Sequence, residues 1–204
     1  MTAARSRESF RTFGWWACGV GVAFFGVYPT LNWLTARRTS IFDMYMDWEL
    51  SIPFVPELVW VYLSMYILFP LPPLFLNVSQ LRVLGKQLIA ATLFSGLAFV
   101  LFPGRLGYAR VVPESGLYAD FFSFLFVLDG VHNVAPSLHV VYSAIITGAI
   151  VDATLSPAVR AWFRIWLGLL CTSTLFVHQH HVIDVASGLA VAVFFRSWIQ
   201  EGKK

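Results

Sequence analysis

Two short polar segments in the last third of the 204-residue chain hold the residues best suited to chemistry. Residues 136–139 read Pro-Ser-Leu-His, and residues 173–184 contain His180 and Asp184. One imidazole can attack a phosphorus atom while a second donates a proton to the leaving oxygen. Both segments border long apolar stretches, where an ionisable group is costly and by default marks a function. The pattern predicts phosphoryl transfer without a metal.

The spacing assigns a role to each of these groups. Asp184 lies four residues after His180, one helical turn away, so its carboxylate can hold one imidazole nitrogen as a donor and leave the other to attack. We therefore predict that His180 is the nucleophile and that His139 is the general acid.

The phosphate oxygens need positive partners in such a reaction. Pro136-Ser137 is typical of a helix start, so free N–H groups at that end are expected to face the phosphate. Arg105 and Arg110 precede this segment and are expected to clamp the oxygens in a bidentate manner.

The composition is that of a membrane protein. Hydrophobic residues make up 58% of the chain and charged residues 12%, against roughly half and a quarter in soluble domains. The length allows one bundle of about six spans at ~20 residues each, so residues 1–204 are predicted to form a single membrane-embedded domain. The net charge of +3 and the lack of a dense basic run argue against nucleic acid as a partner.

The apolar stretches predict an all-α fold, an integral membrane six-transmembrane-helix bundle. The expected spans are residues 13–34, 57–69, 86–102, 137–151, 161–177 and 182–199. The apolar piece 117–128 is too short to cross and is expected to be a short interfacial helix between the third and fourth spans. In the first span four glycines are expected to let a neighbouring helix approach closely, namely Gly14, Gly19, Gly21 and Gly26.

Basic residues predict the orientation. Six spans place both termini, the 2–3 loop and the 4–5 loop on one side of the membrane. That side holds most of the basic residues: Arg5, Arg7, Arg11, Arg82, Lys86, Arg160, Arg164, Arg196, Lys203 and Lys204. The positive-inside rule then places both termini in the cytoplasm. Both histidine segments are expected together on the outer, periplasmic face of a bacterial inner (plasma) membrane.

The residues named above resemble the motifs of the type 2 phosphatidic acid phosphatase superfamily, the integral membrane lipid phosphate phosphatases. Pro136, Ser137 and His139 match the second motif, Pro-Ser-x-His, in full, and Ser173 and His180, with Asp184, match most of the third. The resemblance implies a six-helix bundle, a phosphohistidine intermediate on His180 and His139 as proton donor. It also implies a membrane lipid phosphate as substrate and neither a metal nor another cofactor.

The chain departs from the family at the phosphate-binding positions. Thr174 stands where the third motif usually has Arg, as in a branch resembling inositol phosphorylceramide synthases and related bacterial phosphatases. His178 or His181 would then supply the missing contact, with His178 and Ser173 expected among the phosphate-binding residues. In the degenerate first motif Arg110 matches the Arg, and Arg105 takes the place of the Lys.

These observations predict a membrane lipid phosphatase that hydrolyses a phosphomonoester or diphosphate headgroup. The alternative is a lipid phosphotransferase that passes the phosphoryl headgroup to an alcohol acceptor. A non-enzymatic scaffold or transporter for lipid phosphates is a third interpretation, and zinc binding by residues 178–181 (His-Gln-His-His) is a fourth. Arg105 and Arg110 could also serve only to anchor their loop to lipid headgroups. The sequence leaves the particular lipid and the oligomeric state open.

Overall fold

The computed structural model describes residues 3–114 and 116–200, with side chains from residue 7 onward except that of Leu128. The protein is mostly helical. Its long helices are α1 (Ala3–Thr35), α5 (Val78–Leu101), α7 (Leu138–Ala153), α8 (Pro157–Phe176) and α9 (Val182–Trp198). The shorter elements are η1 (Asp47–Ser51), η2 (Pro56–Leu58), α2 (Val59–Leu63), α3 (Met65–Leu68), α4 (Pro72–Phe75) and α6 (Leu117–Leu128). Only β1 (Phe42–Asp43) and β2 (Gly104–Arg105) form a named sheet, and it is parallel.

Side-chain caps set where the helices begin. Ser137 Oγ accepts a hydrogen bond from Val140 N (3.3 Å) at the start of α7, and Ser156 precedes Pro157 at the start of α8. Asn77 caps α5 through a reciprocal pair of bonds with Gln80. The sequence prediction began this helix at residue 86, eight residues too late, because its polar first turns interrupt the apolar run.

The predicted second span contains an interruption. The chain from Pro56 to Phe75 is divided into η2, α2, α3 and α4, and the apolar stretch Pro56–Leu68, which covers most of residues 57–69, is helical apart from a turn at Ser64. The break between α2 and α3 falls at Ser64, whose hydroxyl donates to the Val61 carbonyl (2.6 Å) and accepts from Trp166 Nε1 (2.8 Å). A serine that bonds back to its own turn in this way competes with regular helix hydrogen bonds.

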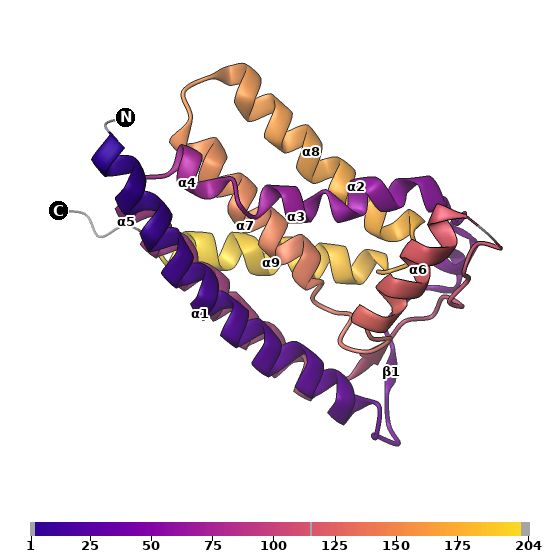
Figure 1. Ribbon diagram of the computed structural model, residues 1–204. Coiled ribbons are helices and arrows are strands. Elements are labelled where there is room, and N and C mark those ends of the chain that lie inside the picture. The colour runs from indigo at the N-terminus through magenta and orange to yellow at the C-terminus, as the bar shows by residue number, and fades with distance from the viewer. Residues whose placement is uncertain (1–2, 115, 201–204) are drawn as a thin grey trace.

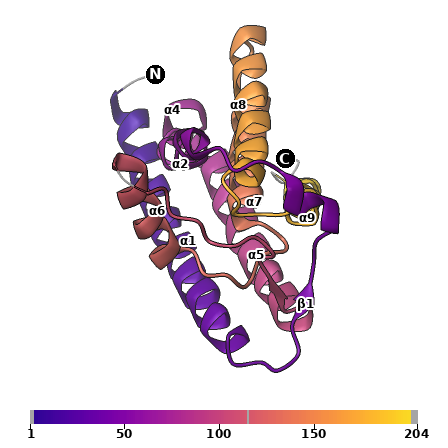
Figure 2. The same cartoon turned by 90° about the vertical axis from the view of Figure 1, so that its right-hand side faces the viewer.

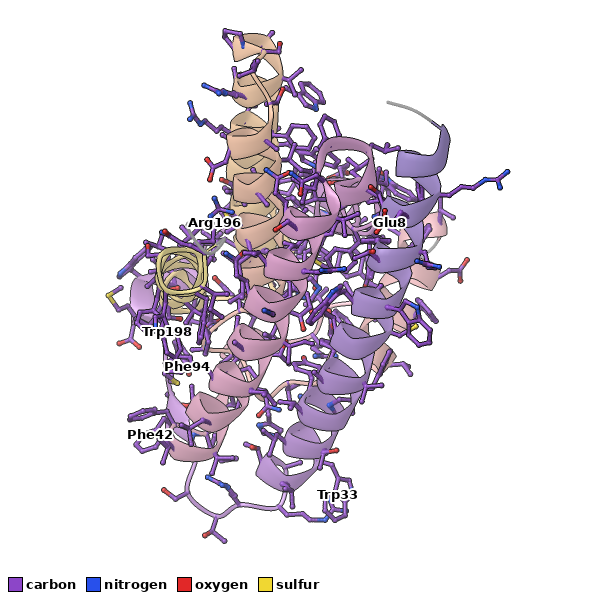
Figure 3. The ribbon with its side chains drawn as sticks, turned by 90° about the vertical axis from the view of Figure 1, so that its left-hand side faces the viewer. Glu8, Trp33, Phe42, Phe94, Arg196 and Trp198 are labelled. Atoms are coloured by element: carbon purple, nitrogen blue, oxygen red, sulfur yellow. The ribbon has the colours of Figure 1, made fainter. Side chains whose placement is uncertain are left out.

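Helices α1 and α5 lie side by side along their length (Figures 1 and 3). The glycines that allow this contact lie in α5, not at the α1 positions that the sequence suggested. A Cβ at Gly85 would come within 2.3 Å of the Trp16 ring, and one at Gly96 within 2.6 Å of Val27. Three of the four α1 glycines have open space around them and the fourth, Gly19, makes only an ordinary contact.

The main core lies between α5, α7, α8 and α9 and contains large buried side chains such as Leu81, Leu88, Ile145, Ile150 and Phe195. One pair of buried hydroxyl groups inside it is hydrogen-bonded. The Thr92 hydroxyl lies 2.5 Å from the Tyr142 hydroxyl and donates to the Leu88 carbonyl (2.7 Å). This pairing removes most of the cost of burying hydroxyl groups.

The chain enters and leaves its helices at two opposite ends of the molecule. The start of α1 and the end of α9 lie at one end of the molecule, and the loops that lead into α7 and α9 lie at the other (Figure 1). Figure 2 looks onto this second end, with α6 and the connecting loops toward the viewer. The chain order therefore brings both histidine segments to the same end.

Within the described residues, two helical stretches are long and apolar enough to cross a membrane by length and composition, Arg7–Thr35 and Val78–Leu101. Large apolar side chains also lie on the outside of the helices, and Figure 3 labels four of them, Trp33, Phe42, Phe94 and Trp198. The predicted orientation drew in part on Arg5, Lys203 and Lys204, whose side chains lie outside the described residues.

Candidate functional site

His180 is held from both its backbone and its ring. Its N–H donates to the Thr174 carbonyl (3.1 Å), and its Nδ1 lies 3.3 Å from Oδ2 of Asp184. Asp184 is fully buried, and the same oxygen accepts the His181 N–H (2.8 Å), which fixes the carboxylate at the start of α9. Nε2 of His180 has no hydrogen-bond partner among the residues that the structure describes. The predicted pairing is therefore present, and it leaves Nε2 as the nitrogen that can attack.

His139 lies beside His180, as the sequence predicted. The two ring centroids are 5.7 Å apart and the ring planes meet at 61°. A backbone bond from Ser137 N to the Asp184 carbonyl (3.0 Å) ties the two segments together. Gly188 permits this approach, because a Cβ there would lie 3.0 Å from the Ser137 carbonyl oxygen. The side chains of His139 and His180 are 17% and 9% exposed, so both rings are largely buried.

His139 has two partners that the sequence did not suggest for it. The Tyr62 hydroxyl lies 2.7 Å from its Nε2 and 3.3 Å from its Nδ1, and donates to Oδ2 of Asp129 (2.7 Å). That carboxylate oxygen lies 4.0 Å from Nε2. The sequence pattern did not single out Tyr62 as a site residue, because it lies in an apolar run. Asp129 was not among the predicted site residues, although a carboxylate directly after an apolar helix could have marked it.

A buried carboxylate, Glu49, holds the start of α9 from the other side. Its Oε2 accepts from Val182 N (2.7 Å) and lies 3.3 Å from His181 Nδ1, in contact but without hydrogen-bond alignment. His181 Nε2 accepts from Gly107 N (3.0 Å). Burial lowers the pKa of His181, although the carboxylates of Glu49 and Asp184 act in the opposite direction. A neutral imidazole agrees with its role as an acceptor for Gly107.

The His181 ring is part of a column of four stacked rings. Tyr45 stacks on His181 (centroids 4.8 Å apart), His181 on Tyr108 (4.3 Å), and Tyr108 on His178 (4.0 Å). His178 Nε2 lies 2.9 Å from the Ile52 carbonyl oxygen, and burial lowers its pKa. His178 was predicted to contact phosphate. In the structure its ring is bonded to the Ile52 carbonyl and stacked on Tyr108, and burial disfavours a positive charge on it.

Four arginines lie toward this end, and each already donates to another group. Arg105 pairs with the Asp43 carboxylate (2.7 Å) on the exposed surface, and this bond lowers the pKa of Asp43. Arg110 donates to the carbonyls of Phe126 and Asp129. Arg37 donates to the Trp33 carbonyl, and Arg38 donates to the Val100 carbonyl. The structure thus brings neither predicted clamp, Arg105 nor Arg110, into contact with the histidines.

The two predicted serines are both buried and engaged with backbone. Ser137 caps α7, as described above, and Ser173 Oγ donates to the Leu170 carbonyl (2.8 Å) within α8. The three histidines between residues 178 and 181 do not converge, because their ring nitrogens contact different partners. Across the described ranges no set of three His, Cys, Asp or Glu side chains is placed to hold a metal ion.

Replacing Glu49 by alanine is expected to lower the free energy of unfolding by about 1–3 kcal/mol. The substitution leaves two partly buried N–H groups, those of Met46 and Val182, without their carboxylate acceptor. Unfolding in mixed detergent micelles, followed by circular dichroism, measures the change. Glu57→Ala removes an exposed carboxylate from η2 and serves as the matched control, with an expected change near zero. Equal stability of the two variants would contradict the structural role of Glu49.

Comparison of the chain with protein-family models, with curated proteins and with solved structures finds no match.

Proposed function

We propose that the protein is an integral membrane lipid phosphatase that works through a phosphohistidine on His180. The observation that carries the proposal is the pair of adjacent imidazoles, each with its own buried or half-buried carboxylate. Asp184 faces His180, and Asp129 faces His139 through Tyr62. Two imidazoles with separate acidic partners are suited to separate roles, one as nucleophile and one as acid and base.

The reaction would proceed in two displacements. Nε2 of His180 attacks phosphorus, the bond from phosphorus to the lipid oxygen breaks, and His139 gives that oxygen its proton. Asp184 stabilises the positive charge that develops on the His180 ring. A water molecule then attacks phosphorus, His139 takes its proton, and the phosphorus–nitrogen bond breaks to release phosphate and free His180. The first N–H groups of α7 are placed beside His139 to stabilise charge on the phosphate oxygens.

A membrane setting agrees with the apolar exterior. In the proposed arrangement α1, α5, α7, α8 and α9 cross the bilayer together with the broken α2–α4 segment, and α6 lies at the interface. Support comes from the exposed apolar side chains and from the position of both chain ends opposite the histidines. The excess of basic residues at the ends of the chain favours placing them in the cytoplasm, with the site on the outer face. A lipid could then present its headgroup to the site from within the bilayer.

The arginines favour the second candidate, a lipid phosphotransferase. All four arginines toward this end are already hydrogen-bonded, and the site itself contains two carboxylates, Asp129 and Asp184. Such a site is better matched to a phosphodiester, a monoanion, than to a phosphomonoester dianion. Attack on a phosphodiester would leave the headgroup phosphate on His180, and an alcohol acceptor would discharge it.

Phosphate release from a panel of purified lipid phosphates, in detergent and with EDTA present, tests the phosphatase proposal. We expect release from at least one phosphomonoester or diphosphate lipid. The same panel extended to phosphodiester lipids, with and without an added lipid alcohol, separates transfer from hydrolysis through the phosphorylated lipid product. Pulse labelling with a radioactive substrate should place acid-labile label on the protein. Binding of these lipids with no turnover of any of them would favour a scaffold or transporter instead.

A further inference from the structure

The partners of His139 come from two segments that carry no recognised motif. Tyr62 belongs to α2, and Asp129 follows directly after α6. The Tyr62 side chain is 1% exposed, and its hydroxyl bridges Asp129 and the imidazole with two contacts of 2.7 Å. Because an ionised carboxylate only accepts hydrogen bonds, the Tyr62 proton points to Asp129 and its oxygen accepts from the imidazole.

The carboxylate is itself fixed in place. Arg110 donates to the Asp129 carbonyl and to the Phe126 carbonyl, and its guanidinium carbon lies 4.7 Å from the centre of the Phe126 ring. The end of α6 is therefore held against the 110 region, and Asp129 with it. This contact gives Arg110 a role that does not require it to touch phosphate.

We propose that Tyr62 and Asp129 are positioning residues that orient His139 as the acid of the reaction and favour its protonated form. The inference rests on the proposed function, because it assigns partners to the acid of that reaction. A buried imidazolium is costly, and a carboxylate 4.0 Å away offsets part of that cost. The hydroxyl between them gives the imidazolium a hydrogen-bond acceptor and restricts rotation of its ring.

The other groups around His139 do not supply this function. His180 approaches from the loop before α9, and as a second imidazole it disfavours a positive charge on His139. Cys171 of α8 lines the same small cavity as His139 and Tyr62, and a thiol is only a weak hydrogen-bond partner. The cation nearest to Asp129, Arg110, is directed to backbone carbonyls. Asp129 is therefore the carboxylate that favours the protonated form.

The test compares Asp129→Asn and Tyr62→Phe with the unmodified protein on a lipid that the latter turns over. We expect kcat/KM to fall about 10- to 100-fold in each variant, less than the loss in His139→Ala. Without the carboxylate the imidazolium is less stable, so the alkaline limb of the pH–rate profile should move to lower pH in Asp129→Asn. Tyr62→Phe keeps the ring that packs in the core and should shift the limb in the same direction.

Asp120→Asn on the exposed face of α6 and Tyr66→Phe on α3 are matched controls, and both should retain the original profile. Combining Tyr62→Phe with His139→Ala should cause little further loss, because the tyrosine acts through that histidine. Activity that falls without any shift of the alkaline limb would overturn the inference, since misfolding lowers the amount of active protein and not its pH dependence. An unmodified protein that turns over no lipid phosphate would instead overturn the proposed function.

Discussion

His180→Ala is expected to abolish turnover of every lipid that the protein accepts, with a loss of at least about a thousand-fold in kcat. The substitution removes the nitrogen that forms the covalent intermediate. Because no nitrogen is left at this position to carry the phosphoryl group, the same variant should show no acid-labile phosphate label. Steady-state phosphate release and pulse labelling measure the two effects independently.

His132→Ala is the matched control for this variant. It removes an imidazole from the same end of the molecule, in the loop that pairs with Arg105, and outside the contacts between the two reactive rings. We expect it to keep both turnover and label. Full activity in His180→Ala would exclude the phosphohistidine mechanism altogether.

Asp184→Asn is expected to lower kcat by about 10³- to 10⁴-fold while leaving the helices intact. The amide oxygen can still accept the His181 N–H, so the start of α9 keeps its cap. The same oxygen position also faces His180 Nδ1, but an amide oxygen carries no negative charge. It therefore cannot stabilise the positive charge that develops on the His180 ring when Nε2 attacks phosphorus.

The circular dichroism spectrum of Asp184→Asn should match that of the unmodified protein, in contrast to its activity. Adding His180→Ala should cause only the loss already seen in His180→Ala alone, because both residues serve one nucleophile. A variant with normal kcat would show that Asp184 acts only as a helix cap.

The helices were largely readable from the sequence because their apolar runs are long and their caps are local. Residues 182–199 and 117–128 were predicted almost to the residue, and α9 and α6 cover them. The segment from Pro56 to Phe75 was not readable in this way. Its division depends on Ser64 and on Trp166, a partner 102 residues away that no local pattern reveals.

The proximity of His139, His180 and Asp184 was also predictable, since the three residues stand in recognisable local patterns. Their supporting contacts were not. Glu49 and Tyr62 reach the site across long sequence separations, and a glutamate in a polar loop or a tyrosine in an apolar run has no distinctive spacing. The hydrogen-bond partners of the predicted phosphate-binding residues were also not predictable. Arg105 and His178 were judged by their order in the chain, whereas the structure commits them to Asp43 and to the Ile52 carbonyl.

The contact between Glu49 and the start of α9 has a consequence for how the protein is made. The bond from Val182 N joins residues 133 positions apart, with the acceptor near the beginning of the chain and the donor near its end. At a synthesis rate of about 5–20 residues per second, roughly 7 to 27 s pass between the synthesis of Glu49 and that of Val182. During that interval Glu49 and the 45–52 segment must stay hydrated. The candidate site therefore cannot close before α9 is made, and a nascent chain that stalls before α9 leaves the Glu49 carboxylate without its Val182 partner.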